Sequence, residues 1–133
     1  MPAHDSADSP QAKPSLRAAL SSLHWLPSPS IFPPAAKLKL HAYADLLLDW
    51  NRQINLTGAR DAETLWRRHI LDCAWLLTVP RSAKSLKVVD IGSGAGLPGI
   101  LWAILRPEDT VLTLDTVAKK VTFQQVVQRR LGL

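Results

Sequence analysis

Apolar residues recur at intervals of three and four over residues 35–54 and again over 62–79, which places them on one side of an α-helix. In the first segment this side is formed by Leu40, Tyr43, Leu47, Trp50 and Ile54. In the second it is formed by Trp66, Ile70, Cys73 and Leu77. Between the segments, Gly58 favours a turn and Asp61 is suited to cap the second helix, which Pro80 follows. We therefore predict two amphipathic helices joined by a short loop.

The pattern changes at residue 87. The stretch "KVVDI" (87–91) is short and β-branched, and a glycine-rich turn follows it. A helix is predicted over 97–106, a second strand over 110–115, and a helix over 117–132 that ends at Gly132. This alternation is the opening of a doubly wound α/β domain, in which we expect "KVVDI" to be a buried parallel strand.

Residues 1–34 differ from the rest because they hold seven of the ten prolines. Proline lacks a backbone donor and disrupts helix interiors, so we expect a disordered tail with one short helix near residues 15–26 and a stiff linker ending at Pro34. The predicted organisation is thus this tail, a helical part over 35–83, and the α/β part over 84–133.

Composition narrows the class of protein. The chain has 133 residues, 47% of them hydrophobic, and a formal net charge of +5. Its single cysteine excludes an intramolecular disulfide, and the histidines have no metal-ligand spacing. No apolar run is long enough for a membrane helix, and the first residues do not resemble a secretory signal. We expect a cytoplasmic protein that binds neither membrane nor metal.

The candidate chemistry lies in "KVVDIGSGAGLPGI" (87–100). Gly92, Gly94 and Gly96 can adopt positive φ angles and present no Cβ to a ligand, and the loop amides and the following helix offer hydrogen-bond donors. Two registers compete. The spacing of Gly94, Gly96 and Gly99 fits the G-x-G-x-x-G dinucleotide fingerprint of NAD(P)-dependent oxidoreductases. The D-x-G-x-G-x-G spacing that starts at Asp90 is the form typical of S-adenosylmethionine-dependent methyltransferases.

Two acidic residues bear on that choice. The carboxylate of Asp90 would repel a pyrophosphate at the turn, whereas it favours the ammonium and sulfonium of S-adenosylmethionine. Asp115 ends the second predicted strand, where an acid accepts hydrogen bonds from ribose hydroxyls. Both cofactors contain a ribose, so Asp115 predicts adenosine binding without distinguishing them.

Four stretches together resemble one family. They are "WNRQINLT" (50–57), "RHILDC" (68–73), "VVDIGSGAGLPGI" (88–100) and "LTLDTVAKKVTF" (112–123). They are similar to the bacterial 16S ribosomal RNA guanine-N7 methyltransferases, also called glucose-inhibited division protein B. The resemblance implies a class I methyltransferase fold, Rossmann-like and doubly wound, behind a helical N-terminal part.

The family's activity is transfer of a methyl group from S-adenosylmethionine to N7 of one guanine in 16S rRNA. By similarity, Gly92 and Leu97 lie at cofactor contacts, and Asp90, Gly94, Gly96 and Asp115 complete the pocket. Because N7 has a lone pair and no proton to lose, we assign no catalytic acid or base. The expected partner is 16S rRNA or the small ribosomal subunit, bound by a monomer. Candidate phosphate contacts are Arg67, Arg68, Lys119 and Lys120.

Three positions depart from the family's usual residues. Cys73 and Thr116 replace serines, and Gln124 replaces a leucine; we expect all three to leave the cofactor motif untouched. The family's domain also has more strands than the two predicted here. We therefore expect a truncated domain with open sheet edges and an uncovered apolar face, and a non-catalytic fragment is an alternative to an active enzyme.

Overall fold

The computed structural model describes residues 32–78, 80 and 82–133. Residues 1–31, which hold the expected short helix and most of the tail expected over 1–34, lie outside the described residues. The first described helix, α2, spans Pro34–Asn51, with a proline in its first turn where a missing amide is tolerated. Phe32 precedes it and is buried in the core. The folded part therefore begins before the boundary expected at residue 35, because an aromatic side chain in the proline-rich linker finds an apolar contact.

The end of α2 is fixed by Asn51, which belongs to the "WNRQINLT" stretch. Its buried side chain donates to the Ala59 carbonyl at 2.6 Å and accepts from the Leu56 and Thr57 amides at 2.8 and 2.9 Å. One side chain thus ties the loop over residues 52–60 to the helix. This accounts physically for an asparagine at that position.

The second predicted helix is a continuous helical run with changing pitch. It consists of α3 (Ala62–Leu65), the π-helical η2 (Trp66–Ile70), α4 (Leu71–Ala74) and the 3-10 helix η3 (Trp75–Thr78). Asp61 caps it as predicted, since its carboxylate accepts a hydrogen bond from the Thr64 amide at 2.8 Å. The π-helical turn was not expected, because side-chain periodicity over five residues does not distinguish it from an α-helix.

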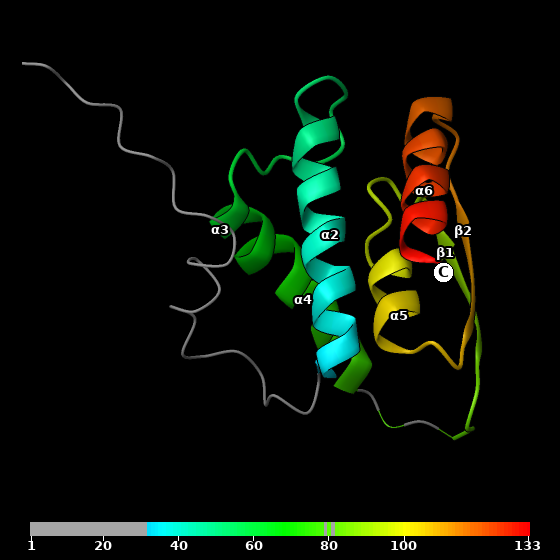
Figure 1. The fold of residues 1–133 in the computed structure, drawn as a ribbon. Helices are drawn as coiled ribbons and strands as arrows, with labels where there is room; N and C mark the ends of the chain where they lie inside the picture. The colour runs from blue at the N-terminus through cyan, green and yellow to red at the C-terminus, as the bar shows by residue number, and fades with distance from the viewer. Residues whose placement is uncertain (1–31, 79, 81) are drawn as a thin grey trace, which may run out of the picture.

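The α/β part has the predicted order of elements. Strands β1 (Lys87–Ile91) and β2 (Thr110–Leu114) pair in parallel, with Lys87 opposite Thr110 and Ile91 opposite Leu114. Helix α5 (Gly99–Leu105) connects them, and α6 (Ala118–Leu131) follows and ends at Gly132 in a left-handed cap. The described helices all lie on one side of the two strands (Figure 1).

The strands are therefore covered on one face only, and the prediction that β1 is a buried strand is wrong for its outer face. Val89, Ile91, Leu112 and Leu114 point away from the helices and are 55, 82, 54 and 44% exposed. An uncovered apolar face was expected for a parallel sheet with only these two strands. Alternate residues of each strand face the helices and are half-buried.

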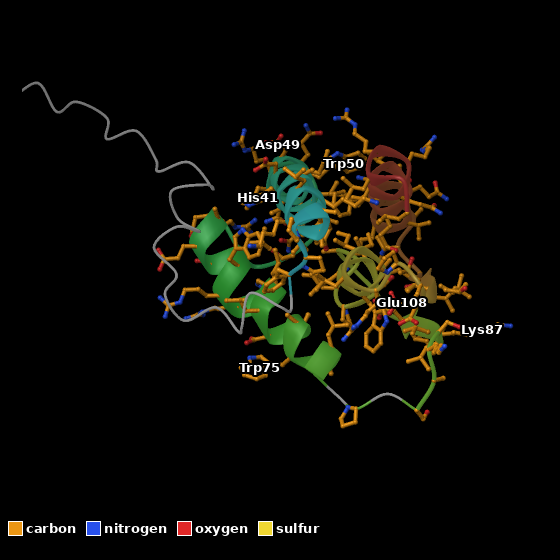
Figure 2. All side chains as sticks on the ribbon, turned by 60° about the horizontal axis from the view of Figure 1, so that its bottom comes forward. His41, Asp49, Trp50, Trp75, Lys87 and Glu108 are labelled. Carbon is orange, nitrogen blue, oxygen red and sulfur yellow. The ribbon has the colours of Figure 1, made fainter. Side chains whose placement is uncertain are left out.

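The core lies where α2 packs against α5 and α6. Tyr43 and Leu47 of α2, Leu101 of α5 and Phe123 of α6 are fully buried there. Trp50 lies between α2 and α6, with its ring centre 5.5 Å from that of Phe123 (Figure 2). The helical N-terminal part and the α/β part thus share one hydrophobic core, and α2 reaches the underside of the glycine turn.

Candidate functional site

The candidate site is the loop over residues 92–98, at the carboxyl ends of both strands. These ends, the loop and the N-terminus of α6 lie at the same end of the molecule (Figure 1). In parallel α/β sheets this edge is where cofactors bind, because the loops there open to solvent and the strands direct their last side chains toward it.

Three glycines of the loop have the positive φ angles that the sequence predicts. The values are +76° for Gly92, +56° for Gly94 and +88° for Gly96. The surroundings of the first two are open: a Cβ added to Gly92 meets nothing within 4 Å, and one added to Gly94 approaches only the Gly92 carbonyl oxygen, at 3.9 Å. Bare backbone is therefore accessible at Gly92 and Gly94.

Gly96 and Gly99 have a different role. A Cβ on Gly96 would overlap the side chain of Ile100, and one on Gly99 would lie 2.7 Å from both Asp90 Oδ2 and Thr113 Cγ2. These two glycines let α5 pack closely on its own first turn and on the sheet. For Gly96, which is buried, the absent side chain is explained by packing rather than by ligand access.

Asp90 is half-buried near the end of β1, and its Oδ2 accepts a hydrogen bond from the Gly99 amide at 2.8 Å. The carboxylate thus accepts the hydrogen bond of the first amide of α5, a position where the helix dipole favours negative charge. Asp90 holds the beginning of α5 against β1 and places negative charge directly below the glycine turn.

Asp115 follows β2 and bonds to the loop from the other side. Its Oδ2 accepts from the Gly94 amide at 2.8 Å and its Oδ1 from the Val117 amide at 2.9 Å. These two backbone hydrogen bonds, Val117 first, lower the pKa of the Asp115 carboxyl, and the charge of Lys120 adds to the shift. The side chain is therefore anionic over a wide pH range and oriented before any ligand arrives.

Most loop amides are already used within the protein. The amides of Gly92 and Ser93 donate to the Leu114 carbonyl, Gly94 donates to Asp115, and Gly96 and Leu97 donate to the Ser93 carbonyl. Of the amides from Gly92 to Gly99, only that of Ala95 has no acceptor among the described residues. The expectation that the loop amides offer hydrogen-bond donors to a ligand is thus restricted to one donor, the amide of Ala95.

Two side chains that the sequence did not single out for the site hold the loop from beneath. The buried hydroxyl of Tyr43 donates to the Ala95 carbonyl at 2.7 Å. The Nε2 of Gln124 lies 2.9 Å from Ser93 Oγ and donates to the Gly94 carbonyl at 2.8 Å. Gln124, which was expected to leave the cofactor motif untouched, thus makes direct hydrogen bonds to two residues of it. The sequence did contain a signal for these contacts. A tyrosine or a glutamine on an apolar helix face is buried with a polar group, and such a group needs a hydrogen-bond partner.

The four basic candidates fall into two separate groups. Lys119 and Lys120 lie in the first turn of α6, and Lys120 is close enough to Asp115 to affect its pKa. Arg67 and Arg68 are on η2, beyond α2 from α6 (Figure 1). Arg67 also pairs with Glu63 at 3.2 Å. Of the four, Lys120 is the one whose charge is shown to act on Asp115 beside the glycine loop.

A groove of about 550 Å³ runs along β2 between α5 and α6. Thr113 and Gln124 are in its lining, but Asp115 and the loop residues 92–97 are not. The groove is therefore distinct from the candidate site. Within residues 32–133 as described, no group of three or more metal-binding side chains is present, and no helix is long and apolar enough to cross a membrane.

A parallel βαβ unit with a glycine turn between two acidic strand ends defines the start of a Rossmann-like class I methyltransferase domain, preceded by helices. Residues 36–133 match the model of the rRNA small subunit methyltransferase G family, and the chain belongs to this family. It is 44% identical over 101 residues to the ribosomal RNA small subunit methyltransferase G of Azoarcus sp. (strain BH72), covering 76% of this chain and 47% of that protein.

Other relatives give the same result. The protein of the same name from Moorella thermoacetica is 42% identical over 94 residues, which cover 71% of this chain and 39% of the relative. That from Syntrophotalea carbinolica is 46% identical over 91 residues, covering 68% and 41%. The chain thus spans half or less of the length of these curated relatives.

Proposed function

We propose that the loop over residues 92–97 binds S-adenosylmethionine, and that the whole protein transfers its methyl group to N7 of a guanine in 16S rRNA. The observation that carries the proposal is the open backbone at Gly92 and Gly94 between two carboxylates at the ends of adjacent parallel strands. Family membership supports the same reaction, since the relatives are named as small-subunit rRNA methyltransferases.

The residues present fit this cofactor. Asp115 has lone pairs left on both carboxylate oxygens, which suit the donors of a ribose. Asp90 places negative charge near the turn, which favours a ligand with an ammonium and a sulfonium group. Leu97 is a half-buried residue of the loop and offers an apolar contact, as the resemblance implies. Gly96 contributes by letting the loop close onto α5.

NAD(P) fits the same residues less well. A pyrophosphate in the G-x-G-x-x-G register needs the N-terminus of α5, but the Asp90 carboxylate already accepts from the Gly99 amide. The second glycine of that register, Gly96, is buried against Ile100 and does not present open backbone. Both points favour the methyl donor over the dinucleotide.

The proposed reaction needs little acid–base chemistry from the protein. The bound cofactor supplies an electrophilic methyl group, and guanine N7 supplies a lone pair without releasing a proton. The protein contributes by aligning the two, which is worth about 7–11 kcal/mol in favourable models. No catalytic acid or base is therefore assigned in this chain.

Lys119 and Lys120 are the proposed RNA contacts nearest the site. They lie in the first turn of α6, where the helix dipole disfavours cations, so a bound phosphate would offset an unfavourable placement. Arg67 and Arg68 are a second proposed contact, on a different face. The partner is 16S rRNA or the small subunit in the cytoplasm, bound by a monomer.

Calorimetric titration of the chain with S-adenosylmethionine and with NAD tests the cofactor. We expect heat from the first and none from the second, and saturable NAD binding without S-adenosylmethionine binding would overturn the proposal. Mass spectrometry of 16S rRNA from cells lacking the gene tests the reaction. Loss of one N7-methylguanine, restored by the whole gene, is expected, and an unchanged methylation pattern would contradict it.

A further inference from the structure

Gln124 is one of the three buried polar residues of the described chain, 6% exposed on α6 beside Phe123. Its amide lies against the turn between β1 and α5, 30 positions earlier in the sequence. Burial of a primary amide is unfavourable unless its donors and acceptor are satisfied, so its partners determine what it does there.

Those partners are all in or next to the glycine loop. Nε2 donates to the Gly94 carbonyl at 2.8 Å and lies 2.9 Å from Ser93 Oγ, while Oε1 lies 3.2 Å from the same hydroxyl. Ser93 Oγ also lies 3.1 Å from the Leu114 carbonyl at the end of β2. The side chain therefore links α6 to both strands through the loop.

Gly94 is consequently held at both of its backbone polar groups. Its amide donates to Asp115 at 2.8 Å and its carbonyl accepts from Gln124 at 2.8 Å. With two fixed hydrogen bonds on opposite sides, the residue is confined to its left-handed conformation, φ +56°. Gly94 is also one of the two loop positions with open backbone.

We propose that Gln124 is a positioning residue that holds the glycine loop in the conformation that binds the cofactor. The proposal rests on the proposed function, because the cofactor is the ligand assigned to this loop. In this role Gln124 does not need to touch the cofactor. A preformed glycine loop binds the cofactor more tightly, because less conformational entropy is lost on binding.

The test compares Gln124→Leu with Gln125→Leu, its exposed neighbour on the same helix turn. Leucine, the usual residue here in the family that the sequence resembles, is one atom shorter than glutamine and has no donor. In this chain it therefore leaves the Gly94 carbonyl without the side-chain partner that Gln124 supplies. We expect Gln124→Leu to weaken S-adenosylmethionine binding about tenfold in calorimetry, within the range for a buried hydrogen-bond group that loses its partner. Gln125→Leu should leave the affinity unchanged.

Hydrogen exchange of the Gly94 amide in the absence of ligand is the second readout. It should be faster in Gln124→Leu than in either the wild type or Gln125→Leu, and addition of S-adenosylmethionine should restore protection. A purely structural role would instead lower the unfolding temperature while leaving affinity and loop exchange equal to the control. That result would overturn the inference.

The two proposals fail in different ways. If the wild type binds S-adenosylmethionine and Gln124→Leu binds it equally well with unchanged Gly94 exchange, the positioning role is wrong and the proposed function stands. If the wild type shows no binding, the proposed function is wrong and the positioning role falls with it.

Discussion

The Asp115 carboxylate accepts a hydrogen bond from the amide of Gly94 at 2.8 Å, although the two residues lie 21 positions apart. The contact joins the end of β2 to the turn that follows β1. Because the same carboxylate also accepts from the Val117 amide, it fixes the loop and the entry to α6 together. One acidic side chain thus organises two of the segments that form the site.

This arrangement predicts a pH dependence. The folded-state pKa of Asp115 lies below its unfolded value of about 3.9, so the stabilisation is complete above that value and is lost as pH falls through the folded pKa. As the pH is lowered below about 4, the free energy of unfolding of the wild type should therefore fall more steeply than that of Asp115→Asn. Urea unfolding at several pH values measures this.

Asp45→Asn is the matched control, since Asp45 is an exposed carboxylate on α2. The free energy of unfolding of Asp45→Asn should change with pH in the same way as that of the wild type. If Asp115→Asn and Asp45→Asn gave the same profile, the two backbone hydrogen bonds to Asp115 would not be present in solution.

Tyr43 provides a second test, because it is the only tyrosine in the chain. Burial raises its pKa well above the usual value, and the charges of Cys73 and Asp90 add to the shift. Phenolate absorbance at 295 nm should appear only when the protein unfolds at alkaline pH, and stability should fall above about pH 10. Ionisation before the loss of helical circular dichroism would contradict the buried contact.

The same hydroxyl supports the glycine loop, so Tyr43→Phe should destabilise the protein by about 1–3 kcal/mol by leaving the Ala95 carbonyl unsatisfied. Denaturant unfolding measures the change. A difference below about 0.5 kcal/mol would mean that water replaces the hydroxyl.

Gly92 and Gly132 form a matched pair for ligand binding. Both have positive φ, +76° and +60°, and at both an added Cβ meets nothing within 4 Å. Alanine should cost a similar backbone strain of about 1–2 kcal/mol at either position. Only Gly92→Ala should also weaken S-adenosylmethionine binding, and equal affinities of the two variants would argue against cofactor contact at Gly92.

Cys73 should react slowly with thiol reagents at neutral pH. Burial, followed by the charges of Asp72 and Asp90, raises its pKa to about 11. Since the thiolate is the reactive form, the alkylation rate of the folded chain should increase with a midpoint near pH 11. A midpoint near that of an unperturbed thiol would show that Cys73 is more exposed than the structure indicates.

Because the outer face of the sheet is open, polar substitutions of its apolar residues should have little effect on the free energy of unfolding. Ile91 is 82% exposed, so Ile91→Thr should change the free energy of unfolding by less than about 0.5 kcal/mol. Leu101 is fully buried, and Leu101→Ala should cost about 2–5 kcal/mol. A large loss for Ile91→Thr in this chain would mean that the outer face is covered in solution.

Local patterns predicted much of this structure. The spacing of Leu40, Tyr43 and Leu47 gave α2 its buried side, and Asp61 capped the next helix. The glycines of the turn have the positive φ angles that were predicted, because glycine adopts this backbone at less steric cost than residues with a Cβ. These features depend on neighbours within a few residues, which a sequence displays directly.

The features that were missed depend on distant parts of the chain. Whether β1 is covered on one face or two is decided by other elements, so a β-branched run alone did not reveal the exposure of Val89 and Ile91. Tyr43 and Gln124 reach loop carbonyls 52 and 30 positions away. Residue type indicated that each needed a partner, but not which one.

Backbone amide spectra of the chain, recorded during titration with S-adenosylmethionine, test the central claim most directly. The account predicts saturable shifts concentrated at Gly92, Gly94, Leu97 and Asp115, with the groove residues along β2 unaffected. Shifts centred on that groove, or no saturable shift in the loop, would contradict it.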